Sequence, residues 1–178
     1  MNIHPFFVHF PIALFIVYSV LEIVVYAWPT LRRPLWVFPV KAFLLFCGVL
    51  AALVALATGG IAEDLIEGSA RSYILEVHSP FAGATTLLYL VLAAAYLVRI
   101  FQMKGWGNQL FGSNRFFSPI LRLKEYLAHL VLDTGMLPML AFLGLIGITI
   151  TGALGAAIVY GPNTDPFVSF VYHLFWAQ

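Results

Sequence analysis

Charged residues and cysteine are what this 178-residue chain has least of. Only 10% of its residues are Asp, Glu, Lys or Arg, against roughly 25% in soluble globular domains, and 62% are apolar. This composition excludes a soluble enzyme and is typical of an integral membrane protein in contact with a lipid bilayer. The formal net charge of +1 leaves no basic surface for nucleic acid, so that class of partner is excluded too.

Cys47 is the only cysteine in the chain. One thiol excludes an intrachain disulfide, an all-cysteine iron–sulfur cluster and covalent haem attachment through a Cys-x-x-Cys-His motif. The sequence also lacks a glycine-rich phosphate loop and a His-Glu-x-x-His zinc motif. Any cofactor therefore has to be held by histidine.

Long apolar runs are what the sequence has in abundance. A helix needs about 20 mostly apolar residues to cross a bilayer. We predict an all-α fold, a single transmembrane domain over residues 1–178 in which four helices form a bundle. The third span is predicted to begin at about Ser79-Pro80, because proline suits the first turn of a helix. The predicted spans are residues 5–28, 35–59, 79–98 and 136–160.

Two further segments are predicted to be helical without crossing. A helix that begins at Ser118-Pro119 is expected to be amphipathic and to lie on the inner surface of the membrane. The run from Phe167 to Ala177 is too short to cross and is expected to cap the outer face as an interfacial helix. Small residues along spans two and four are interpreted as close helix packing; they are Gly48, Ala52, Ala55, Gly144, Gly147, Thr151, Gly152, Gly155 and Ala156.

Positive charge is unevenly distributed between the connections. The first and third connections are basic, whereas the second holds four acidic residues against Arg71. The positive-inside rule then predicts that both termini and the acidic loop face the periplasm of a bacterial inner membrane. The basic residues are Arg32, Arg33, Lys41, Arg99, Lys104, Arg115, Arg122 and Lys124, and the acidic ones are Glu63, Asp64, Glu67 and Glu76.

Four of the five histidines fall near that outward face. His4 and His9 begin the first span, His78 precedes the third and His173 follows the fourth, whereas His129 is interpreted as a solvated residue on the inner side. His9 lies five residues beyond His4, about 7.5 Å deeper along a helix, where an ionisable side chain is a functional candidate.

Two neutral imidazoles from two helices can hold a haem iron without cysteine. We therefore predict that His9 and His78 ligate the iron of a b-type haem, with His4 and His173 as further cofactor-binding residues. An alternative stays open, in which His9 only hydrogen-bonds to a neighbouring helix and His78 only helps to start span three. Glu22 and Lys41, the remaining charges within the spans, lie at similar depth on neighbouring helices, which predicts an ion pair.

The run from His4 to Leu14, His-Pro-Phe-Phe-Val-His-Phe-Pro-Ile-Ala-Leu, closely resembles the opening signature of a family of small bacterial predicted membrane proteins, domain of unknown function 2231. Weaker similarities follow at Ala57-Thr58-Gly59, at His78 and in the glycine-rich run from Thr151 to Gly161. The resemblance covers residues 1–162 and leaves the tail unexplained.

Members of that family look distantly similar to four-helix b-type cytochromes and occur beside, or fused to, c-type cytochrome modules. The resemblance thus implies electron transfer, with His4, His9 and His78 as the matching histidines. Because spans two and four contain no histidine, we expect at most one haem per chain.

The leading hypothesis is a haem b protein that passes electrons between a membrane donor and a periplasmic acceptor such as a c-type cytochrome, which the acidic loop would attract. The first alternative is a non-catalytic accessory subunit that packs against other membrane subunits of a respiratory or photosynthetic complex. The second is a metal-ion or proton pathway with the outer histidines as entry and Glu22 as relay. An electron-transfer or accessory role is favoured over a stand-alone enzyme.

Overall fold

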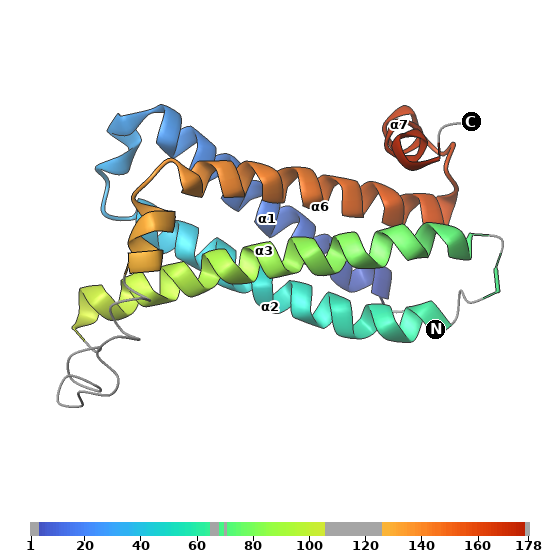
Figure 1. The fold of residues 1–178 in the computed structure, drawn as a ribbon, viewed down its shortest axis with the longest axis horizontal. Coiled ribbons are helices and arrows are strands. Elements are labelled where there is room, and N and C mark those ends of the chain that lie inside the picture. Colours follow the sequence, from blue (N-terminus) through green and yellow to red (C-terminus); the bar gives the residue numbers. More distant parts are fainter. Residues whose placement is uncertain (1–3, 65–67, 70, 106–125, 177–178) are drawn as a thin grey trace.

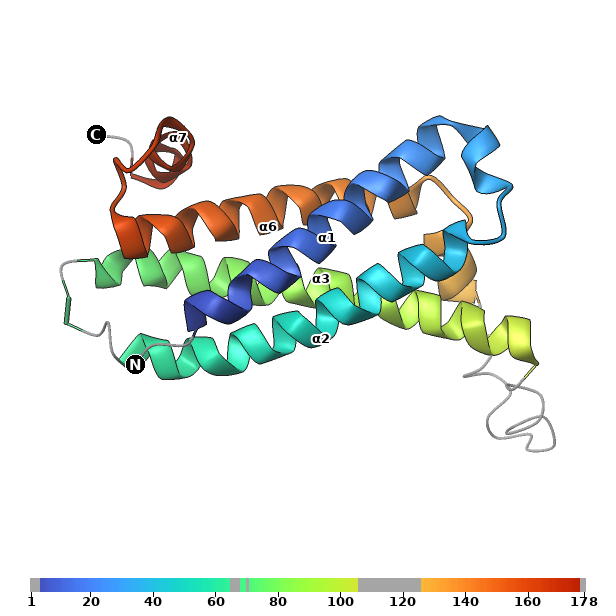
Figure 2. The same ribbon diagram turned by 180° about the vertical axis from the view of Figure 1, so that it is seen from behind.

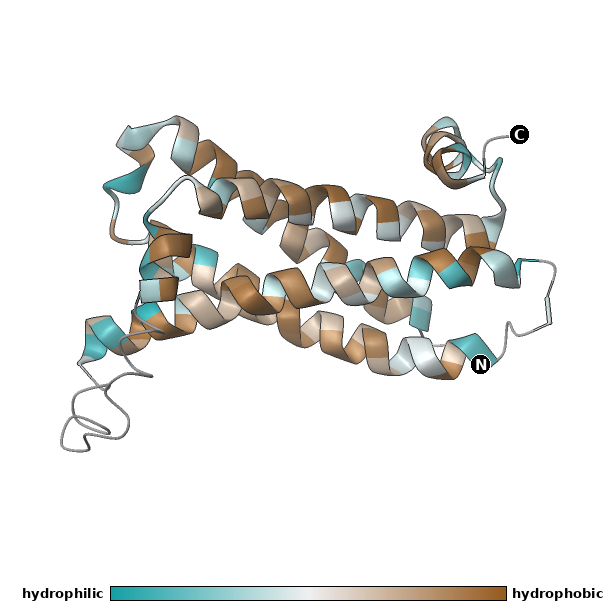
Figure 3. Cartoon of the chain, in the orientation of Figure 1, coloured by the Kyte–Doolittle hydropathy of each residue, from teal (hydrophilic) through white to brown (hydrophobic). Residues whose placement is uncertain are grey.

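Four long helices make up most of the chain in the computed structural model, which describes residues 4–64, 68–69, 71–105 and 126–176 (Figure 1). Each is long and apolar enough to cross a membrane, which confirms the predicted all-α fold with four spans. Hydrophobic residues cover the length of the bundle and hydrophilic ones gather towards its two ends (Figure 3). The four helices are α1 His4–Ala27, α2 Val37–Asp64, α3 Ser72–Lys104 and α6 Met136–Tyr160.

The helices run up and down, so that both ends of the chain lie at the same end of the bundle (Figures 1 and 2). A short 3-10 helix, η1 Pro29–Arg32, connects α1 to α2 at the opposite end. Helix α1 packs against α2 and α6, and α3 packs against the same two helices. Helices α1 and α3 are therefore diagonally opposed and run in the same direction.

Helix α3 is longer than predicted and begins at Ser72 instead of Ser79. Packing explains the earlier start, because Ile74 is fully buried in a cluster with residues of α6. Arg71 also donates to the carbonyls of Ile158 and Val159, at 2.9 and 3.0 Å, which ties the start of α3 to the end of α6. Pro80 is consequently inside the helix, and so is His78. Helix α2 likewise continues through Gly59-Gly60 to Asp64.

In the middle of the bundle each helix contributes one residue to what we call the aromatic layer. Phe15 of α1 and Tyr89 of α3 stack, with ring centroids 3.7 Å apart. The facing residues of α2 and α6 are Gly48 and Gly144, where a Cβ atom would lie 2.6 Å from the Phe15 ring and 2.7 Å from the Tyr89 ring. The two glycines thus provide the space in which rings from diagonally opposed helices meet.

Adding a methyl group at this layer is expected to destabilise the bundle. Gly144→Ala should lower the free energy of unfolding by about 1–3 kcal/mol, because Tyr89 is held by Phe15 and by a 2.8 Å hydrogen bond to Ser19 and has little room to move. Gly83→Ala is the control, since a Cβ there meets nothing within 4 Å. Thermal unfolding in detergent measures both, and equal stability of the two variants would contradict this account of the layer.

Towards the η1 end, a second set of four residues forms the ion-pair layer, made of Glu22, Lys41, Tyr96 and Leu137. Lys41 Nζ lies 2.8 Å from Glu22 Oε2, and the two residues are 8% and 2% exposed. The Tyr96 hydroxyl donates to the other carboxylate oxygen of Glu22. The predicted ion pair between Glu22 and Lys41 is confirmed.

The last helix, α7 Pro166–Phe175, is seen end-on in Figure 1, beside α6. Asp165 begins it by accepting hydrogen bonds from the backbone of Phe167 and Val168, both 2.9 Å long. The helix packs against α6 and the start of α3, near the end of the bundle. It confirms the short C-terminal helix that the sequence predicted over residues 167–177. Of the predicted amphipathic helix, residues 126–132 are helical and residues 118–125 lie outside the described residues.

Candidate cofactor site

At the end of the bundle that holds both chain ends, two histidines and two glycines form the histidine layer. His4 of α1 faces Gly59 of α2, where a Cβ would lie 3.3 Å from His4 Cε1. His78 of α3 faces Gly155 of α6 in the same way, with Cε1 again 3.3 Å from such a Cβ. A larger residue at either glycine would press on an imidazole ring.

The histidine layer repeats the plan of the aromatic layer. The step between the two is eleven residues in every helix, from 4 to 15 in α1, from 59 to 48 in α2, from 78 to 89 in α3 and from 155 to 144 in α6. Eleven residues are about three helical turns, so the same helix face returns at the same height in all four helices. Helices α1 and α3 supply rings, and α2 and α6 supply glycine, at both levels.

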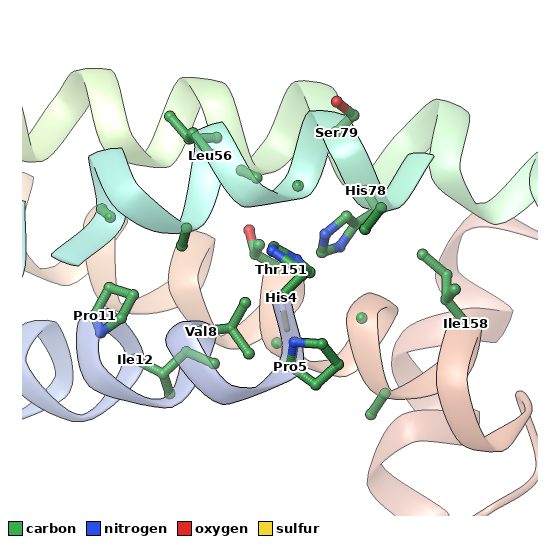
Figure 4. A pocket seen from close by; sticks show the side chains of 18 of the residues that line it. His4, Pro5, Val8, Pro11, Ile12, Leu56, His78, Ser79, Thr151 and Ile158 are labelled. Carbon is green, nitrogen blue, oxygen red and sulfur yellow. The ribbon is translucent and has the colours of Figure 1, made fainter. Parts of the chain in front are cut away.

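A cavity of about 280 Å³ adjoins the histidine layer. Its volume is close to the lower end of the range of roughly 300–1,000 Å³ that small-molecule and cofactor sites occupy. The lining is mostly apolar, and His4 and His78 lie close together in it, next to Thr151 (Figure 4). The other polar side chains that line it are His9, Glu63, Ser79, Thr86 and Tyr160.

The His4 ring is oriented by α2. Its Nδ1 lies 3.1 Å from Thr58 Oγ1. The Thr58 hydroxyl is within hydrogen-bonding distance of the carbonyls of Val54 and Ala55, at 3.0 and 3.1 Å, so its only proton is directed to the helix backbone. The threonine oxygen therefore accepts from His4 Nδ1–H, and the lone pair of the neutral ring lies on Nε2. A second hydrogen bond that fixes the tautomer in this way is common at metal-bound histidines.

The His78 ring contains a buried nitrogen without a partner. Its Nδ1 makes no hydrogen bond within the part of the chain that the structure describes. Buried polar atoms are nearly always hydrogen-bonded, and each exception calls for an explanation. The rest of the ring lines the cavity beside the Thr151 backbone.

The remaining three histidines are exposed. His9 is exposed, and its Nδ1 lies 2.7 Å from the Pro5 carbonyl, although part of the side chain reaches the cavity. Five residues along a helix are a rotation of about 140°, so His4 and His9 point in different directions. His173 lies exposed on α7 next to Tyr172 and is not among the lining residues, and His129 is near Asp133 at the other end. The structure thus brings His78 together with His4, whereas the sequence paired it with His9.

The chain matches the family described as "Predicted membrane protein (DUF2231)" over residues 1–164. It is a member of that family. Comparison with curated proteins found no match, and neither did comparison with solved structures.

The segments on which the resemblance to DUF2231 rested meet at the cavity. The opening signature supplies His4, the Ala57-Thr58-Gly59 segment supplies both the partner of His4 and the glycine that it faces, and the run from Thr151 supplies Gly155. Sequence reasoning had interpreted Gly155 as a packing residue and had not singled out Thr58, Gly59 or Glu63 as site residues. The order of these motifs along the DUF2231 chain was the available signal, because motifs from four helices that share one end of a bundle can form one site.

Proposed function

We propose that this DUF2231 protein is a membrane b-type haem protein that passes electrons between a membrane donor and a periplasmic acceptor, with His4 and His78 as the two iron ligands. One observation carries the proposal: two imidazoles from diagonally opposed helices converge on a largely apolar cavity, each facing a glycine. The ligand pair is revised from His9 and His78, because His9 is exposed and its Nδ1 lies 2.7 Å from the Pro5 carbonyl of its own helix.

The donor set favours haem over a bare metal ion. A porphyrin supplies four ligands to its iron, so that the protein has to add only two, and two imidazoles are a common pair. A structural zinc ion takes four protein ligands and a catalytic one takes three. Within residues 4–64, 68–69, 71–105 and 126–176, no three His, Cys, Asp or Glu side chains gather closely enough to hold a metal ion.

Each part of the site has a task in this proposal. When bound, the haem would supply an iron that accepts and releases one electron at a time. Thr58 holds the His4 ring in the tautomer whose Nε2 carries the lone pair, and Gly59 and Gly155 leave space beside the two rings. Apolar walls from all four helices, among them Val8, Ala55 and Ile148, limit the access of water to the site.

Acidic residues at the histidine-layer end of the bundle indicate which kind of electron acceptor could bind there. Glu63 lines the cavity, and the same end of the bundle carries Asp64 and Glu76. An acidic rim attracts a basic protein, which fits a periplasmic c-type cytochrome if this end faces outward, as the positive-inside rule predicts.

Orientation can be checked with reporters fused after Gln178. A reporter that functions only in the periplasm is expected to be active, because the basic connections favour the cytoplasmic side. A reporter that functions only in the cytoplasm is the matched control and is expected to be silent. The reverse pattern would place the histidine layer at the cytoplasmic side and would remove the periplasmic acceptor from the proposal.

The function itself is tested by the absorption spectrum of the purified chain, reduced minus oxidised. A sharp α-band of the kind that bis-imidazole haem gives is expected, with about one haem per chain, because there is one pair of converging histidines. A preparation that stays colourless after expression with added haem precursor would contradict the proposal and favour the accessory-subunit alternative.

A further inference from the structure

A line of polar side chains follows the buried face of α3 through the middle of the membrane. His78, Thr85, Tyr89 and Tyr96 are separated by steps of seven, four and seven residues, the spacing of one helix face. Thr85, Tyr89 and Tyr96 are 6%, 0% and 1% exposed. Polar side chains in the interior of a span are costly, and those that face the bundle interior often mark a route for ions or protons.

Both ends of this line open into a cavity. At the histidine layer, Thr86 and His78 line the cavity of about 280 Å³. At the ion-pair layer, Lys41 and Tyr96 line a second cavity of about 300 Å³, together with Arg99 and Asp133, which form an ion pair with each other. The two cavities lie on opposite sides of the aromatic layer.

Between the cavities, the hydroxyl groups stand close to one another. The Tyr96 hydroxyl and Lys41 both donate to Glu22. The Tyr18 ring contacts the rings of Tyr96 and Tyr89 edge to face. Its ring centroid lies 6.1 Å from that of Tyr96 and 6.2 Å from that of Tyr89. The Tyr18 hydroxyl is buried beside Glu22 and Tyr96 but makes no hydrogen bond of normal geometry among the described residues. Tyr18 thus adjoins Glu22 and Tyr96 through its hydroxyl and Tyr89 through its ring.

On the other side of Tyr18 the next hydroxyl pair is Ser19 and Tyr89, which hydrogen-bond at 2.8 Å. Thr85 and Thr86 follow about one turn further along α3. The Thr86 hydroxyl donates to the Ala82 carbonyl at 2.8 Å, and Thr86 lines the histidine-layer cavity. Hydroxyl groups donate and accept at the same time, so such a series can transfer a proton without forming a lasting charge.

We propose that Glu22, Tyr96, Tyr18, Ser19, Tyr89 and Thr86 form a proton path that joins the two cavities through the bundle. A proton that binds Glu22 from the ion-pair side is passed to the Tyr96 or Tyr18 oxygen, and that hydroxyl turns and gives its own proton to the next oxygen. Each hydroxyl gives up one proton for the one it accepts, and Thr86, turned from the Ala82 carbonyl, releases a proton into the histidine-layer cavity. The charged group that faces Glu22 is Lys41 on α2, and the titratable neutral groups beside it are the hydroxyls of Tyr18 and Tyr96. The path requires no haem, so the inference goes beyond the proposed function and stands or falls separately from it.

The inference is tested in lipid vesicles that contain the purified chain and an internal pH dye, with a potassium gradient and valinomycin to drive proton entry. The wild-type chain is expected to raise the rate of internal acidification several-fold over protein-free vesicles. Tyr89→Phe keeps the ring and removes only the hydroxyl, so it is expected to abolish most of that increase. Tyr18→Phe is expected to do the same.

Tyr126→Phe is the matched control, because it is the same chemical change at a side chain that is 64% exposed and outside the path; its flux is expected to equal that of the wild type. A wild-type rate equal to that of protein-free vesicles would overturn the inference without any variant. Wild-type flux in a folded Tyr89→Phe chain, shown by an unchanged size-exclusion profile, would also overturn it and would leave the hydroxyls as helix-packing groups. The haem spectrum of each sample is recorded separately, so that failure of either proposal is recognisable.

Discussion

Replacing His78 by leucine is expected to leave the purified chain without bound haem, and replacing His4 by leucine is expected to do the same. Leucine keeps much of the volume of the side chain but offers no nitrogen to the iron, and one remaining imidazole does not give the bis-imidazole spectrum. His9→Leu should retain haem, because the His9 side chain is exposed and its Nδ1 is hydrogen-bonded to the Pro5 carbonyl of its own helix. His129→Leu, at the far end of the bundle, is the control and should be unchanged.

Ligation can be separated from a structural effect by His78→Gly. This variant removes the imidazole and leaves a space at the histidine layer, which free imidazole can fill. Restoration of the spectrum by added imidazole is expected if His78 is a ligand. Loss of haem in His9→Leu combined with retention in His4→Leu would contradict the revised ligand pair and restore the pair that the sequence suggested.

Replacing either Glu22 or Lys41 alone is expected to lower the free energy of unfolding more than replacing both. Glu22→Met leaves Lys41 buried without its counter-ion, and Lys41→Met leaves Glu22 as a buried anion, so each single change should lower the free energy of unfolding by about 3–5 kcal/mol. The double variant removes both charges and should lose less than either single one, although Tyr96 then lacks its acceptor. Unfolding in a detergent titration measures the cycle, and additive effects would contradict a coupled pair.

Hydropathy and charge were sufficient to predict much of the fold. The four spans follow from runs of apolar residues, because a bilayer sets both their length and their polarity. The pair of Glu22 and Lys41 followed from depth alone, since two opposite charges in neighbouring spans have few other partners. The start of α3 did not follow, because the packing of Ile74 against α6 and the bonds of Arg71 to the last carbonyls of α6 are long-range contacts.

The histidine pair shows that depth in the membrane alone does not determine which side chains meet. His9 and His78 were matched by distance from the membrane surface, but whether two side chains meet also depends on the rotation of each helix about its own axis. The sequence contained this rotational information in the eleven-residue step, which places His4 on the same helix face as Phe15 and His78 on the same face as Tyr89. It became interpretable only with the packing of the glycines, since Gly48 and Gly59 look like ordinary small residues until the rings that they face are known.

The aromatic layer also has a mechanical consequence. The Phe15 and Tyr89 rings stack at the middle of the bundle, so α1 and α3 are in contact there. If these two helices change their tilt about this contact, the distance between them changes at both ends of the bundle together. Spanning helices adjust their tilt when the hydrocarbon layer becomes thinner or thicker. We therefore expect the spacing between His4 and His78 at one end, and the width of the cavity beside Lys41 at the other, to depend on the thickness of the surrounding lipid as well as on the protein.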